Sequence, residues 1–170
     1  MSYKELKSYQ NAVIIYDFTT EFCAKYIDFR SRTKDQMEQA ARSGKQNIVE
    51  GTQASRTSLK SEIKLLGVSR ASFEELLEDY IDFLRQRNLK IWDKDSQDVQ
   101  EIRKLAYKTD RTYGTYKSYM PDSEKAANVM ICLINQTNFL LDRQIDSVES
   151  KFISEGGYSE NLFKKRRKNL

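Results

Sequence analysis

Basic side chains flank a short turn near the middle of the chain. Arg42 and Lys45 precede this turn, and Arg56 and Lys60 follow it. If the turn joins two antiparallel helices, we expect these cations to meet at one end of a helical domain. Lysine and arginine in such a cluster neutralise phosphates and release counterions, which makes binding depend on salt. The residues therefore indicate a nucleic-acid contact, and the alternative is a solvated helix end with ordinary surface charge.

A denser group of cations occupies residues 161–170, where no acid is present. Its members are Lys164, Lys165, Arg166, Arg167 and Lys168. Because the net charge of the whole chain is +4, the rest of the sequence is slightly negative. We expect a disordered C-terminal tail, residues 158–170, that adds nonspecific affinity for RNA, DNA or an acidic partner. The alternative is a terminus that only keeps the protein in solution.

Tyrosines alternate with cations between residues 111 and 119. Tyr113, Tyr116 and Tyr119 lie close in sequence to Arg111 and Lys117. This combination makes Tyr113 and Tyr116 candidates for stacking on unpaired bases. We favour the alternative, in which the rings pack on the helices and expose their hydroxyl groups.

Acidic side chains form a band that has the chemistry to bind a hard cation or to exchange protons. Its members are Glu74, Glu75, Glu78, Asp79 and Asp82. No second set of ligands accompanies them, so we predict no metal site. We interpret the band as a solvated face, or as a face that pairs with basic residues of a neighbouring subunit.

The chain contains no histidine, which is the usual general base near neutral pH and the commonest metal ligand. This excludes Ser-His-Asp and Cys-His triads and the Glu-x-x-His di-iron motif. The segment 43–46 lacks the first glycine and the final Ser/Thr of a phosphate-binding loop. We therefore predict a protein that is not an enzyme and that needs no cofactor.

Cys23 and Cys132 lie on or beside apolar helix faces, which is typical of small buried side chains. Two cysteines without a secretory signal indicate a reducing compartment, so we expect a cytoplasmic protein. The longest apolar run, residues 129–134, is too short to cross a bilayer, and no membrane contact is expected.

Helical periodicity and capping residues predict the elements that position these side chains. The expected helices cover residues 2–29, 31–51, 58–88, 99–107 and 123–155. Their expected caps are a capping box at Ser2 and Glu5, Gly51 at the end of the second helix, Ser58, and either Asp95 or Ser96. Residues 107–119 have no clear period, and we interpret them as frayed helix or ordered loop.

Small side chains predict a close approach between the second and third of these helices. Met37, Ala41, Gly44 and Ile48 form the inner face, and Gly44 lowers helix propensity by about 1 kcal/mol relative to alanine. We expect tight packing or a local bend to compensate. In the third helix Arg70 occupies an apolar position, so the helix rotates there or Arg70 pairs with a buried acid.

The last helix has two adjacent apolar lines, which indicates burial deep in a bundle or at a subunit interface. Together these features predict an all-α protein, an antiparallel four-helix bundle with a short inserted helix and loop between the third and fourth long helices. We assign residues 1–157 to a single domain with an insertion at 89–122, and residues 158–170 to the basic tail.

Three stretches of the sequence support a family assignment. They are Gln36–Gly51, with Ala41-Arg42-Ser43 before Asn47-Ile48-Val49-Glu50-Gly51; the helix Ser58–Leu84; and Asn128–Tyr158, which ends in Glu155-Gly156-Gly157-Tyr158. In these stretches the chain resembles the four-helix-bundle family of proteins encoded in 23S ribosomal RNA intervening sequences, which includes the accessory variability determinants of retroelements. The last helix is similar to the branch called the four helix bundle suffix domain.

This resemblance implies a homo-oligomer, which is a ring-like pentamer in characterised relatives. It also implies binding of nucleic acid and of a reverse transcriptase through a basic surface, as in the retroelement relative. The chain departs from the family at Gly44-Lys45, where many relatives carry Ile-Pro, so the helix-end geometry is expected to differ there.

We therefore expect a non-enzymatic oligomeric bundle that binds structured RNA or other nucleic acid through a basic end surface, helped by the tail. The alternative is a protein–protein interaction scaffold with no nucleic-acid role. The wide apolar stripe of the last helix and the acidic band favour that alternative.

Overall fold

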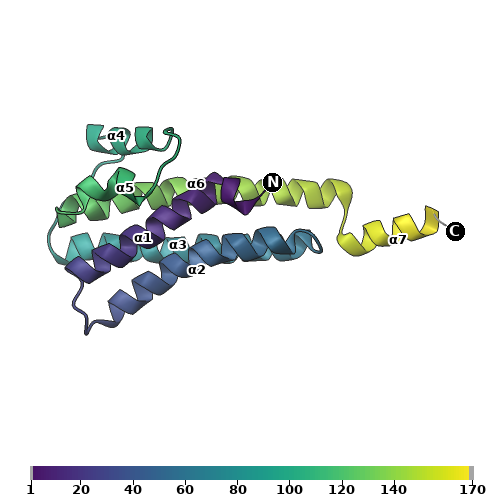
Figure 1. Cartoon of the computed structure of the whole chain (residues 1–170), viewed down its shortest axis with the longest axis horizontal. Helices are drawn as coiled ribbons and strands as arrows, with labels where there is room; N and C mark the ends of the chain where they lie inside the picture. Colours follow the sequence, from purple (N-terminus) through teal and green to yellow (C-terminus); the bar gives the residue numbers. More distant parts are fainter. Residues whose placement is uncertain (1, 169–170) are drawn as a thin grey trace.

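The computed structural model describes residues 2–168 and shows an all-α protein, with no strand among these residues (Figure 1). Four long helices dominate the chain: α1 (Lys7–Tyr26), α2 (Arg32–Ala54), α3 (Leu59–Gln86) and α6 (Ser123–Glu155). The shorter elements are η1 (Tyr3–Glu5), α4 (Gln97–Leu105), α5 (Tyr113–Tyr116), η2 (Lys117–Tyr119) and α7 (Tyr158–Lys168). Position 1 of the predicted domain and positions 169–170 of the predicted tail lie outside the described residues.

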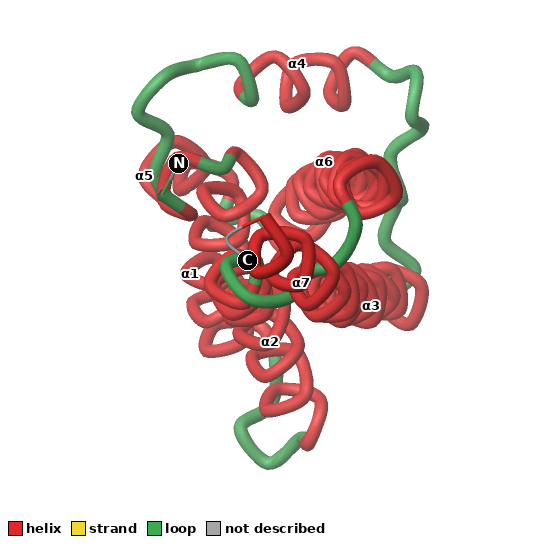
Figure 2. Tube along the Cα trace, turned by 90° about the vertical axis from the view of Figure 1, so that its right-hand side faces the viewer, coloured by secondary structure: helices red, strands yellow, loops and turns green. Residues whose placement is uncertain are grey.

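The long helices pack against one another and run in alternating directions (Figure 1). Helix α2 lies against α1 and α3, and α6 lies against α1 and α3 as well. Figure 2 views the long helices nearly end-on. In this view α4 stands outside them and above α6, with which it is in contact. None of the helices in residues 2–168 has the length and hydropathy that crossing a bilayer requires.

Side-chain caps set most helix starts where the sequence predicts them. Ser31, Ser58 and Ser96 each accept a hydrogen bond from a backbone amide at the start of α2, α3 and α4. The capping box of Ser2 and Glu5 is also confirmed, but it closes only the 3-10 turn η1. Leu6 then adopts extended backbone, so α1 begins at Lys7 rather than continuing from Ser2.

Gly51 does not end α2, and that prediction is wrong. The helix continues to Ala54, and Gly51 is buried inside it. A β-carbon at Gly51 would lie 3.4 Å from the β-carbon of Leu65, so this glycine lets α3 approach. Gly156 does end α6, with a φ of 76° that glycine adopts at little cost.

Gly44 shows the tight packing that the sequence predicts. An added β-carbon would lie 2.6 Å from the tip of the Phe73 ring, which is fully buried on α3. The Ser69 hydroxyl also donates a 2.7 Å hydrogen bond to the Gly44 carbonyl. The absence of a side chain at Gly44 therefore lets α3 lie directly against the backbone of α2.

The inner apolar lines of α6 are buried within the protein rather than left on its surface. Met130, Leu133, Ile134 and Leu141 are completely inaccessible to solvent. Farther along, Ile145 and Val148 are half-buried, and Ile153 is 84% exposed. Burial among the helices therefore accounts for the stripe up to Leu141, but not for its C-terminal part.

Arg70 pairs across two helices, so the apolar gap in the α3 pattern has a local explanation. Its guanidinium donates to Glu74 on α3 at 2.6 Å and to Asp142 on α6 at 3.0 Å. Both carboxylates are about half exposed, so the partners are surface acids and not the buried acid that the sequence suggested.

The inserted segment folds back onto α6 through one buried amide. The Asn128 side chain accepts from the backbone amide of Trp92 and donates to the carbonyl of Lys90, both at 2.8 Å. The Tyr26 hydroxyl donates to the carbonyl of Met120 at the far side of the insertion. These bonds fix both ends of residues 90–120 to the long helices.

Candidate nucleic-acid interface

Arg56 and Lys60 lie together at the turn between α2 and α3, and both are exposed. Arg42 and Lys45 do not join them. Because α2 continues to Ala54, these two residues lie in its interior, about 18 Å and 14 Å before its end at 1.5 Å per residue. The structure therefore divides the predicted cluster into a pair at the turn and a pair midway along α2.

Of the two residues midway along α2, Lys45 already has a partner. Its ammonium lies 5.1 Å from the centroid of the Tyr16 ring on α1, and the side chain is half-buried. Arg42 is exposed and forms no hydrogen bond or ion pair with residues 2–168. Lys45 is thus a weaker candidate for phosphate contact than Arg56 or Lys60.

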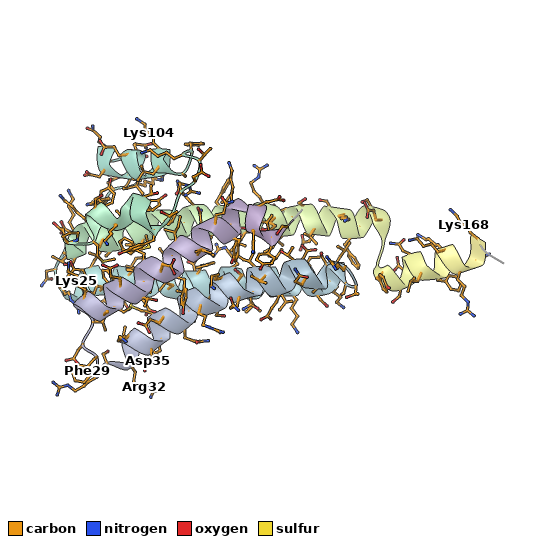
Figure 3. The ribbon with its side chains drawn as sticks, viewed as in Figure 1. Lys25, Phe29, Arg32, Asp35, Lys104 and Lys168 are labelled. Atoms are coloured by element: carbon orange, nitrogen blue, oxygen red, sulfur yellow. The ribbon has the colours of Figure 1, made fainter. Side chains whose placement is uncertain are left out.

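The basic tail is helical, so the prediction of disorder is wrong for residues 158–168. They form α7, which has no buried residue and extends away from the packed helices (Figure 1). The separation of charges supports the helix: Glu160 lies in its first turn and four cations in its last, the arrangement that the helix dipole favours. The predicted contacts Lys164 to Lys168 are all exposed, and Lys168 lies near the far tip in Figure 3.

Helix α7 begins beside the α2–α3 turn. A hollow of about 150 Å³ lies between them, and its lining includes Arg56 from the turn, Lys151 and Glu155 from α6, and Tyr158 and Asn161 from α7. We call the following set the basic end: Arg56, Lys60, Lys151, Lys164, Lys165, Arg166, Arg167 and Lys168. Within residues 2–168, none of these cations lies within 4.0 Å of a carboxylate oxygen.

One buried acid lies under this surface. Burial raises the pKa of Glu62 on α3, and the nearby Lys151 ammonium partly opposes that rise. Glu160, the acid of α7, is occupied at the α6–α7 link, where its carboxylate accepts from the Gly157 amide at 3.2 Å. The cations of the basic end are therefore left to solvent.

Tyr116 cannot stack on a base, and that prediction is wrong. Its ring is completely buried, and its hydroxyl accepts a 3.1 Å hydrogen bond from Arg111. Tyr113 packs edge-on against Phe18, with ring centroids 6.0 Å apart, and its hydroxyl donates to the Glu21 carboxylate. Packing of these rings on the helices is therefore confirmed for both residues, but the predicted exposure of their hydroxyl groups is wrong, because both hydroxyls are bonded within the protein.

The acidic band of α3 is not one uniform surface. Glu74 binds Arg70 and Asn138, and Asp82 binds Arg85 at 2.8 Å. Asp79 is half-buried, and one of its carboxylate oxygens is inaccessible and has no hydrogen-bond donor. No group of acids, cysteines or histidines in residues 2–168 is arranged to hold a metal ion. Pairing of the band with a neighbouring subunit stays a prediction.

Asp79→Asn is expected to stabilise the protein at neutral pH and to have little effect near pH 4. Burial, followed by the charges of Glu75 and Asp82, raises the pKa of Asp79 from 3.8 to about 6. The folded protein therefore holds the Asp79 proton more tightly than the unfolded chain does, so protonation stabilises the fold. This stability is complete below pH 3.8 and is lost as the pH rises through about 6. Thermal unfolding at both pH values measures this, with the exposed Glu78→Gln as control. A stability gain of equal size at both pH values would contradict it.

Both cysteines are buried, as the sequence predicts. Burial raises the pKa of the Cys23 thiol to about 12 and that of Cys132 to about 11. Neither thiol is therefore ionised near neutral pH, which agrees with a packing role.

A cavity that the sequence did not indicate lies between α4, the start of α1 and the middle of α6. Its volume is about 460 Å³, and its lining includes Lys7, Trp92, Arg103 and Phe139. These residues come from four separate parts of the chain, so no local motif marks the site. The one feature of the sequence that points to this cavity is Trp92, a large aromatic side chain in the mostly polar segment between α3 and α4.

Comparisons of the chain with protein-family models, with curated proteins and with solved structures return no match. The family resemblance therefore rests on the sequence motifs alone.

Proposed function

We propose that this protein is a non-enzymatic four-helix bundle, formed by α1, α2, α3 and α6, that binds structured RNA or other nucleic acid through its basic end. The observation that carries the proposal is that α7 begins beside Arg56 and that its cations, with Arg56 and Lys60, lie toward one end of the molecule (Figure 1). These cations have no acidic partner among residues 2–168. Unpaired cations at this density favour a polyanion over a neutral partner.

The geometry of α7 suits a phosphate backbone better than a single anion. Its five consecutive cations span more than one helical turn, so they point to several sides of the helix. A duplex or folded RNA presents phosphates along two strands, and a basic helix lying between them contacts both. Such contacts read backbone shape rather than sequence, so we expect affinity for structured RNA with little base preference.

The exposed position of α7 supports the same proposal. An isolated helix of eleven residues is marginal in water, and α7 has no buried residue with which to anchor itself. Phosphates bound between its cations would lower their mutual repulsion and favour the helical form. Nucleic acid is therefore expected to order α7 further, as an increase in helical circular dichroism.

Self-association is part of the proposal. Val68 and Ile153 are large apolar side chains with 41% and 84% of their surface exposed. A ring-like pentamer, which the family resemblance implies, would bring several basic ends together and multiply the affinity for a long polyanion. Native mass measurement tests it, since a single-chain mass at micromolar concentration would contradict the oligomer.

The two free cysteines favour a cytoplasmic location. The family resemblance favours a nucleic-acid enzyme such as a reverse transcriptase as protein partner.

A pair of charge-reversal variants tests where nucleic acid binds. Arg56→Glu with Lys60→Glu changes two exposed residues at the basic end. Lys25→Glu with Arg32→Glu makes the same change in net charge at the opposite end, where Figure 3 labels both side chains. We expect the first variant to bind a structured RNA hairpin at least about tenfold more weakly than the second, measured by fluorescence anisotropy. Equal losses in the two variants would contradict the proposed location.

A second candidate function is a protein-interaction scaffold without nucleic acid. The observation that favours it is the apolar surface of α7 and the α6 terminus, where Ile153, Leu162 and Phe163 are 84%, 48% and 61% exposed. Capture of partners from a nuclease-treated lysate separates the two functions. Protein partners that remain bound without nucleic acid, together with no direct RNA binding, would favour the scaffold.

A further inference from the structure

The cavity between α4, α1 and α6 has the size and walls of a small-molecule site. Its volume of about 460 Å³ lies within the range of about 300–1,000 Å³ that is common for ligand pockets. Trp92 and Val99 from the inserted segment and Ile131, Phe139 and Leu140 from α6 supply its apolar walls. The α4 residues Val99 and Arg103 line its outer side, and Figure 2 shows α4 outside the long helices and above α6.

Cations surround this apolar cavity without any acid among its lining residues. They are Lys7, Lys94, Arg103 and Arg111. None of these four forms a salt bridge within residues 2–168. Low-dielectric walls strengthen the field of such charges, so the cavity attracts anions.

One of the cations is held in place. The Arg111 guanidinium donates to the Asn11 side chain at 2.7 Å and to the Tyr116 hydroxyl at 3.1 Å. A positioned arginine binds phosphate or carboxylate better than a freely moving one, because less side-chain entropy is lost.

We infer that this cavity binds a nucleoside phosphate. Its aromatic base would lie among Trp92 and Phe139, and the phosphates would contact Arg103 and the neighbouring cations. Two aromatic side chains in the wall favour a flat aromatic group over the flexible chain of a fatty acid. The inference is independent of the proposed function, because no residue of the cavity belongs to the basic end, and α4 and α7 lie toward opposite ends of the molecule (Figure 1).

Trp92 provides the readout, since it is the single tryptophan of the chain and lines the cavity. ADP titrated into the full-length protein is expected to quench its fluorescence saturably. Adenosine, which lacks the phosphates, and inorganic phosphate, which lacks the base, should each bind at least about tenfold more weakly. No saturable response to ADP would overturn the inference. So would stronger binding of oleate, or a response to a single-stranded oligonucleotide but not to ADP.

Two substitutions on α4 make the matched comparison. Arg103→Gln removes a cation that lines the cavity, whereas Lys104→Gln removes the same charge from the next residue, which is exposed and lies outside the lining. We expect Arg103→Gln to weaken ADP binding by roughly tenfold or more, as loss of a charged hydrogen bond does, and Lys104→Gln to leave it unchanged. Equal affinities in the Arg103 and Lys104 variants would overturn the inference, whatever the outcome of the RNA experiments.

Discussion

Gly44→Val is expected to destabilise the protein by about 3 kcal/mol, although valine is a better helix former than glycine. The new β-carbon would lie 2.6 Å from the Phe73 ring, well inside van der Waals contact. The ring is fully buried and cannot swing into solvent. The Ser69 hydroxyl also ties α3 to the Gly44 carbonyl, so the two helices cannot separate without losing a buried hydrogen bond.

Gly67→Val is the matched control for this prediction. Gly67 lies inside α3, as Gly44 lies inside α2, but a β-carbon there would meet nothing within 4 Å. The same substitution should therefore change stability by no more than about 0.5 kcal/mol, in the stabilising direction. Urea denaturation measures both variants. If Gly44→Val were as stable as Gly67→Val, the close packing of α2 on α3 would be wrong.

Replacing the five cations of α7 with glutamine is expected to lower the affinity for structured RNA by about a hundredfold or more at moderate salt. The substituted residues are Lys164, Lys165, Arg166, Arg167 and Lys168, all exposed. Each lost phosphate contact should also reduce the salt slope by about one unit. Because these residues contact no other helix, the melting temperature of the protein should stay the same.

A second α7 variant separates charge from apolar contact. Leu162→Gln with Phe163→Gln removes the exposed apolar side chains of α7 and keeps every cation. If phosphate contact provides the affinity, this variant binds RNA like the parent protein. A loss in the Leu162/Phe163 variant together with full binding by the five-glutamine variant would instead favour the scaffold function.

The long helices could be predicted from sequence because their signals are local. Ser58 and Ser96 cap helices at predicted positions, and the small residues around Gly44 predict the close packing of α2 on α3 that is observed. Gly51 shows the limit of this approach. A glycine at a helix end and one under a neighbouring helix look the same in sequence, and only the contact with Leu65 distinguishes them.

The sites were harder to predict than the helices, because they depend on distance along and between elements. Arg42 and Lys45 precede the same turn in sequence that Arg56 adjoins. The rise of the helix nevertheless places them about 18 Å and 14 Å before the end of α2. The cavity depends on Lys7, Trp92, Arg103 and Phe139 meeting in space, which no local pattern reveals. Tyr116 is of a residue type that stacks on bases, but its ring is completely buried, so it packs in the core instead.

The salt dependence of RNA binding tests the central claim most directly. We predict that the logarithm of the association constant falls linearly with the logarithm of salt concentration, with a slope of magnitude about 4 or more, since several phosphates are neutralised. The full-length protein and a structured RNA hairpin are the only components required. Binding that is undetectable at low salt, or an affinity that does not change between low and high salt, would contradict the claim that the basic end contacts phosphates.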